Sequence, residues 1–170
     1  MSTEPLPEPW LLGPMEGVSP FLAPVLRSFE QVREDLARHT AGLTDEQVWE
    51  RPLGLAPVGF QLRHIAGSVD RLMTYAMGGG LDAAQMRALR EEMTPGSSRE
   101  ELLAAVDTAL SRAEEQIRSI DPATLSEVRA VGRKRLPTTV IGLLIHIAEH
   151  TQRHTGQAIS AAKLAAVGRL

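Results

Sequence analysis

The stretch VIGLLIHIAEHTQRHTGQAISAAKL, residues 140–164, decides the fold. Apolar residues recur in it at steps of three and four, which predicts a long amphipathic helix from Pro137 to about residue 165. Steps of three and four from the first valine predict this core-facing set: Val140, Leu143, Ile147, His150, His154, Gln157, Ala161 and Leu164. Two imidazoles in neighbouring core layers would need partners for their buried polar atoms, and a bound metal ion would satisfy both.

Three earlier segments show the same helical period. They run from Pro20 or Pro24 to about His39, from Pro57 to Gly78, and from Ser98 to about Asp121. Their expected core residues are Val25, Phe29, Val32 and Leu36 in the first; Val58, Leu62, Ile65, Val69, Leu72 and Ala76 in the second; and Leu102, Val106, Leu110, Ala113 and Ile117 in the third.

The segments between these helices are shorter or more polar. A capping-box pattern at Thr44 and Gln47 predicts one short helical turn, and residues 81–94 have a weak helical pattern. Residues 121–136 read as a polar connector, and no segment alternates with the period of a strand. The proline-rich residues 1–19 are expected to form an extended arm that packs over the helices.

Four helices with one apolar stripe each bury those stripes most economically as a bundle. We therefore predict an all-α protein in which residues 1–170 form a single four-helix-bundle domain. The long piece between the second and third helices predicts a crossing connection in place of a tight hairpin.

Composition excludes several classes of function. A net charge of -3 and a pI near 6.0 argue against nucleic-acid binding, which relies on a basic surface. The absence of cysteine excludes thiolate metal sites and a cysteine nucleophile. The N-terminus lacks the pattern of a signal peptide, and no apolar run is long enough to cross a bilayer. We expect a soluble, cytoplasmic protein with no membrane partner.

The histidines of the last helix are the candidate site. His146, His150 and His154 are spaced so that either adjacent pair could hold one ion, whereas the outer two lie about 12 Å apart along the axis. The expected register favours His150 with His154. A third ligand would come from His64, in the middle of a helix, more readily than from His39 at a helix end. The alternative is a bundle whose histidines are structural or simply titrate.

Two stretches carry a resemblance to a known family: APVGFQLRHIAGSVDRLMTYAMGG, residues 56–79, and HIAEHTQRHTGQ, residues 146–157. They resemble the second and last helices of the DinB-like superfamily of four-helix metalloenzymes, which includes the YfiT-like proteins and the bacillithiol and mycothiol transferases. The likeness covers most of the chain.

The resemblance implies a DinB-like bundle with His64, His150 and His154 as ligands of one divalent metal, zinc or nickel. It also implies a homodimer and a small-molecule substrate, with a low-molecular-weight thiol as a possible cosubstrate for transfer or related hydrolytic chemistry. The competing hypothesis is a non-catalytic, stress-related or interaction protein with structural histidines.

Overall fold

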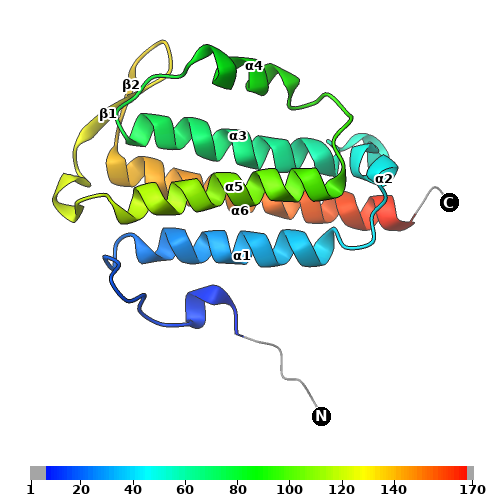
Figure 1. Cartoon of the computed structure of the whole chain (residues 1–170), viewed down its shortest axis with the longest axis horizontal. Coiled ribbons are helices and arrows are strands. Elements are labelled where there is room, and N and C mark those ends of the chain that lie inside the picture. Colours follow the sequence, from blue (N-terminus) through cyan, green and yellow to red (C-terminus); the bar gives the residue numbers. More distant parts are fainter. Residues whose placement is uncertain (1–6, 168–170) are drawn as a thin grey trace.

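Four long helices lie side by side in the computed structural model, which describes residues 7–167 (Figure 1). The helices are α1 (Ala23–His39), α3 (Val58–Ala76), α5 (Arg99–Arg118) and α6 (Val140–Val167). Helix α3 packs against both α5 and α6, and α1 packs mainly against α6. This arrangement confirms the predicted all-α four-helix bundle.

The connection between α3 and α5 crosses the length of the bundle. Both helices begin at the end where the short helix α2 (Asp45–Trp49) lies, so they run in the same direction (Figure 1). The chain returns along the outside through α4 (Ala83–Glu91), which has no buried residue of its own. The predicted crossing connection is therefore confirmed, and it brings the residues after α4 back against α3.

The predicted helix starts and core stripes of the first three long helices are observed. Thr44 and Ser98 both form complete capping boxes, in which side chain and backbone exchange hydrogen bonds with the residue three positions later. The expected core residues of α1 and α5 are all buried, as are those of α3 except for the partly buried Leu72. Aliphatic side chains and Phe29 thus fill the core.

The prediction that no strand is present was wrong. Residues Val128–Val131 (β1) and Leu136–Thr139 (β2) form an antiparallel hairpin within the expected polar connector, with Val128 paired to Thr139. These strands are short and largely exposed, so they lack the apolar alternation by which a half-buried strand is recognised. Pro137 belongs to β2, and α6 begins at Val140 instead.

The predicted core register of α6 is observed up to Ile147 and at Ala161, but the other predicted positions beyond Ile147 were wrong. The buried stripe continues through Thr151, Thr155, Ala158, Ala161, Ala162 and Ala165, whereas Gln157 and Leu164 are exposed. Threonine fits this stripe because its hydroxyl can bond back to the helix, as Thr155 Oγ1 does by donating to Thr151 O. His150 and His154 lie beside the stripe and are half-buried.

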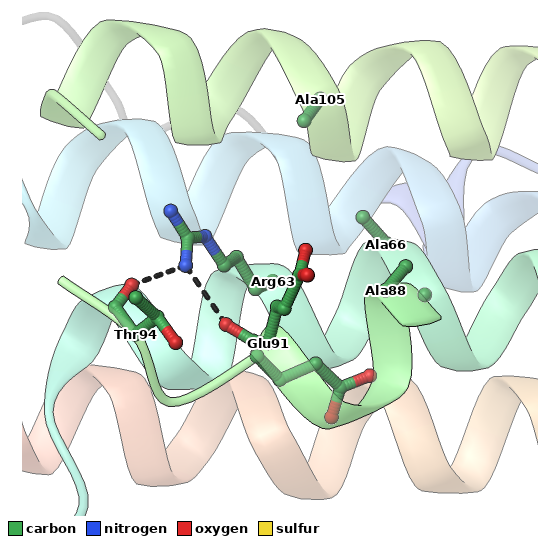
Figure 2. A pocket seen from close by; sticks show the side chains of 8 residues that line it. Arg63, Ala66, Ala88, Glu91, Thr94 and Ala105 are labelled. Carbon is green, nitrogen blue, oxygen red and sulfur yellow. Dashed lines mark hydrogen bonds between the residues drawn. The ribbon is translucent and has the colours of Figure 1, made fainter. Parts of the chain in front are cut away.

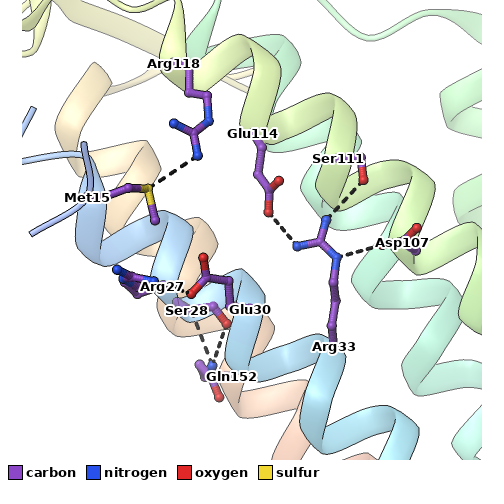
Figure 3. Close-up of polar contacts among 10 residues, drawn as sticks. All are labelled: Met15, Arg27, Ser28, Glu30, Arg33, Asp107, Ser111, Glu114, Arg118 and Gln152. Atoms are coloured by element: carbon purple, nitrogen blue, oxygen red, sulfur yellow. Dashed lines mark hydrogen bonds and ion pairs between the residues drawn. The ribbon is translucent and has the colours of Figure 1, made fainter. Parts of the chain in front are cut away.

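Polar contacts join α1 to its neighbours (Figure 3). The guanidinium group of Arg33 reaches α5, where it donates to Asp107 at 2.7 Å, Glu114 at 2.5 Å and Ser111 at 3.1 Å. Gln152 of α6 donates to the carbonyl oxygen of Ser28 at 3.0 Å. These contacts fix α1 against both helices without entering the interface between α3 and α6.

The N-terminal arm packs over α1 as expected, although residues 1–6 of the predicted arm lie outside the described residues. It contains one short 3-10 helix, Pro9–Leu11, so it is not wholly extended. Met15 and Val18 pack against the core. Within residues 7–167, no helix has the length and apolar character needed to span a membrane.

Candidate metal centre

Three histidines from two helices converge at the interface of α3 and α6. His64 lies on α3, and His150 and His154 lie one turn apart on α6. Each side chain offers a ring nitrogen such that the three atoms all lie within 4.8 Å of one another. His64 Nε2 and His150 Nε2 are 3.0 Å apart. The residues predicted from sequence are thus together in space.

This spacing fits a single metal ion. Metal–nitrogen bonds of ~2.0–2.1 Å in a tetrahedral site place ligand nitrogens about 3.3 Å apart. One pair already lies at 3.0 Å, and the outer limit of 4.8 Å requires only small side-chain movements to close. Imidazole is a preferred ligand of zinc and nickel, so the donor set also fits. These three residues could hold a divalent cation.

A buried carboxylate orients His64 from behind. Glu92, which follows α4, places Oε2 2.8 Å from His64 Nδ1, and only 5% of the residue is exposed. In the tautomer that donates this hydrogen bond from Nδ1–H, the lone pair of His64 Nε2 faces the other two imidazoles. Carboxylates hold metal-binding histidines in this way in many sites.

Arg71 neutralises Glu92. Its Nη2 atom lies 2.8 Å from Glu92 Oε1, and both side chains are largely buried. Opposite charges at this distance attract each other strongly where the side chains are shielded from water. Gly67 makes this possible, because a Cβ there would lie 2.6 Å from Arg71 Nη1 and 2.9 Å from Glu92 Oε1. A glycine inside α3 is therefore explained by close packing.

Gln61 performs the matching role for His154. Its Oε1 atom lies 2.7 Å from His154 Nδ1, which leaves His154 Nε2 as the nitrogen that faces the cluster. His150 differs, because its buried Nδ1 atom has no hydrogen-bond partner among the described residues. Two of the three imidazoles are thus fixed by partners on the side away from the cluster.

The electrostatics keep the imidazoles of α6 neutral. Burial, assisted by the neighbouring His64, lowers the pKa of both His150 and His154 from 6.5 to about 4. Burial alone would raise the pKa of Glu92, but its contacts with His64 and Arg71 outweigh burial and lower it. At neutral pH the α6 nitrogens therefore carry free lone pairs, the form that binds metal.

The segment that carries Glu92 is held firmly against α3. Arg63 donates to the carbonyl oxygens of Glu91 and Thr94, as Figure 2 shows, and to Ser97 Oγ at 2.8 Å. The same guanidinium group stacks over the ring of Trp49, 4.8 Å from its centre. A cavity of about 370 Å³ lies here between α3, α4 and α5, and Glu92 lines it. These hydrogen bonds of Arg63 hold the segment on both sides of Glu92, and so keep Glu92 in place beside His64.

The remaining histidines are outside the cluster. His146 lies one turn before His150, but its side chain is 47% exposed, and its nearest acidic contact is Glu149 Oε2 at 3.6 Å. His39 is the last residue of α1, at a helix end away from this interface. The ring of His146 lies 5.4 Å from that of His150, but neither His146 nor His39 belongs to the group of three imidazoles.

Comparison with known proteins agrees with this geometry. Residues 28–158 match the family model of the DinB superfamily. The chain belongs to the DinB superfamily. No curated protein matches the sequence significantly.

A solved structure shares the DinB bundle. It is YfiT from Bacillus subtilis, described as a probable metal-dependent hydrolase with an unusual four-helix bundle topology. The two chains are 16% identical, the match covers 89% of this chain and 91% of that one, and the TM-score is 0.65. The likeness establishes the fold and leaves the reaction to be argued from this chain's own residues.

The bundle also places beside the histidine cluster two residues that the sequence pattern did not reveal. Glu92 lies 28 residues from His64 and Gln61 lies 93 residues from His154, so no local spacing links either residue to its imidazole. Gln61 is three positions before His64 on α3, which is the one signal available: it shares a helix face with a candidate ligand. Glu92 has no comparable signal.

Proposed function

We propose that this DinB protein is a metal-dependent enzyme in which His64, His150 and His154 bind one divalent cation. The observation that carries the proposal is the convergence of three imidazoles, two of which have hydrogen-bond partners that aim Nε2 at a common point. Partners that hold the other ring nitrogen and so orient the imidazole are a common feature of metal-binding histidines.

Within this proposal, each imidazole contributes its Nε2 atom. Glu92 holds the His64 proton on Nδ1, and Gln61 Oε1 accepts the Nδ1 proton of His154. A cation held by three neutral ligands would supply Lewis-acid chemistry, which polarises a carbonyl group and favours the deprotonated form of a water or thiol. Three protein ligands leave room for a substrate atom, as in catalytic sites of this kind.

The reaction we propose is transfer of a low-molecular-weight thiol or a related hydrolysis, with zinc or nickel as the metal. Support comes from the neutral nitrogen donor set, which suits both metals, and from the resemblance to superfamily members that act on small thiols. YfiT is described as a probable hydrolase, which supports the hydrolytic alternative. We also propose a homodimer, on the basis of the same resemblance.

The first experiment measures the metal content of protein purified without a histidine tag. We expect close to one zinc or nickel per chain, loss of that metal in His150→Ala, and retention in His146→Ala, whose exposed imidazole lies one turn away. Absence of metal from all three proteins, even after incubation with either cation, would support a non-catalytic bundle with structural histidines.

The second experiment tests for enzyme activity. Metal-loaded protein is incubated with small thiols and electrophiles, and with ester and amide substrates, and products are followed by mass spectrometry. We expect turnover that is lost in His150→Ala and on treatment with a chelator. Stoichiometric metal without any turnover would favour a metal-stabilised scaffold over an enzyme.

A further inference from the structure

A second cavity, of about 460 Å³, lies beside Gln61 and Arg153, the latter being the residue before His154. It lies between the segment before α3 and the exposed face of α6, and Leu55, Gln61, Arg153, Gln157 and Ser160 are among its lining residues. Gln61 belongs to both places, because it lines this cavity and bonds to His154. Gln61 therefore connects the cavity to the proposed ligand His154, which does not itself line it.

The walls of this cavity differ in chemistry. Leu55 and Ala56 form an apolar side, whereas Gln157 and Ser160 on α6 present polar groups. The hydroxyl of Ser160 donates to the carbonyl oxygen of Gly156, which leaves its oxygen lone pairs available. Arg153 is the one charged side chain among the lining residues. The cavity thus combines an apolar surface with a single positive charge.

Arg153 has donors to spare. Its Nη2 atom pairs with Glu149, the residue four positions earlier, and the side chains of both are at least half exposed. Exposed pairs of this type contribute roughly 0–1 kcal/mol, so an incoming anion competes with Glu149 at little cost. A guanidinium group carries donors in a planar fork that matches a carboxylate, and no second acceptor for Arg153 is found among the described residues.

Gly156 keeps the cavity open. It lies within α6, where glycine is less favourable than alanine by about 1 kcal/mol. Unlike Gly67, it is not required by packing, because a Cβ at this position would meet no atom within 4 Å. The space that a side chain would occupy is part of the cavity wall.

The surrounding charges favour an anion as well. Glu92 is paired with Arg71 and Glu149 with Arg153. A divalent cation at the cluster would therefore add positive charge to this region. A ligand that carries negative charge gains from this field as well as from Arg153.

From these observations, we propose that the cavity is the substrate pocket of the centre and that it takes a small molecule with an apolar body and a carboxylate, which Arg153 binds. The inference rests on the proposed function and names its substrate class. When no ligand is bound, the carboxylate of Glu149 pairs with Arg153 in place of the carboxylate of the ligand.

The test uses cobalt(II)-loaded protein, whose visible absorption reports binding near the ion. The probes are mercaptoacetate, 3-mercaptopropanoate and 4-mercaptobutanoate, each compared with the mercaptoalcohol of the same chain length. In wild-type protein we expect at least one acid to bind about ten-fold more tightly than its alcohol, as for a charge-assisted hydrogen bond. Arg153→Gln is expected to abolish this preference without changing the affinity for the alcohols or the cobalt content.

Two further variants complete the design. Arg112→Gln removes an exposed arginine of α5 and is expected to leave the preference intact. Glu149→Gln frees Arg153 from its competitor and is expected to strengthen binding of the acid two- to three-fold, in line with the small strength of an exposed pair. A merely structural role for Arg153 would not produce this opposite response.

The outcomes separate the two proposals. If wild-type protein binds cobalt but favours no acid over its alcohol, or if the preference survives in Arg153→Gln, the substrate-pocket inference is overturned and the metal centre stands. If wild-type protein takes up no cobalt, the proposed function fails, and the inference that depends on it fails with it.

Discussion

Replacement of Glu92 by glutamine tests how far the metal centre depends on a residue that is not itself a ligand. Glutamine preserves the size of the side chain and an oxygen that can accept from His64 Nδ1, but it removes the negative charge that faces Arg71. Loss of a partner behind a metal-binding histidine typically weakens metal affinity by about 10–100-fold. We expect Glu92→Gln to weaken zinc binding within that range.

The same change should lower the free energy of unfolding. The side chains of Arg71 and Glu92 are only 10% and 7% exposed, so the substitution leaves a nearly buried guanidinium group without a counter-charge. Breaking a buried pair from one side costs about 3–5 kcal/mol, and we expect a loss in that range, because the one carbonyl oxygen of glutamine faces His64 and its amide nitrogen then faces Arg71.

The assays for this prediction are zinc competition with a chromophoric chelator and unfolding in urea. Glu91→Gln is the matched control, because Glu91 is the preceding residue and is exposed. Equal zinc affinities for the two variants, within about two-fold, would refute the role we assign to Glu92. Equal free energies of unfolding for Glu92→Gln and Glu91→Gln would refute the claim that the ion pair of Arg71 and Glu92 stabilises the fold.

Three further predictions follow from the same structure. Gly67→Ala places a Cβ against the ion pair of Arg71 and Glu92, and it should lower both the zinc affinity and the free energy of unfolding in urea. Gly156→Ala places its Cβ in open space, and it should raise the free energy of unfolding by about 0.5–1 kcal/mol. Leu110→Ala removes a fully buried side chain and should cost about 2–5 kcal/mol in urea unfolding. Lowering the pH from about 6.5 to about 4 should destabilise the metal-free protein, because His150 and His154 have folded pKa values of about 4 and take up protons more readily when unfolded. Urea midpoints at pH 7, 5.5 and 4.5 would check the direction, and a constant or rising stability would contradict it.

The bundle could be predicted from sequence because its helices carry strong periodic stripes. Residues such as Phe29 in α1 and Leu110 in α5 recur at helical spacing with polar residues between them, and capping boxes mark where α2 and α5 begin. The hairpin of β1 and β2 has no such signal. Its strands are four residues each and mostly exposed, so the pairing of their backbones, which leaves little trace in the side-chain pattern, holds them together.

The candidate site was predictable only in part. The spacing left two adjacent pairs open, and the expected core register favoured His150 with His154, although that register was wrong. The place of His64 in the middle of a helix made it the preferred third ligand, and the resemblance implied the same three residues. Thr151 and Thr155 occupy those core layers, which turns the two imidazoles toward α3. Glu92 could not be predicted, because its contact with His64 depends on how the crossing connection returns to α3. That path is a property of the tertiary fold.

Anomalous diffraction from crystals soaked in zinc would test the central claim most directly. Data collected on either side of the zinc absorption edge would reveal any bound ion. We expect one strong peak per chain, ~2.0–2.1 Å from the Nε2 atoms of His64, His150 and His154. A fully soaked crystal with no peak between α3 and α6, or with zinc only at the exposed His146, would contradict the account.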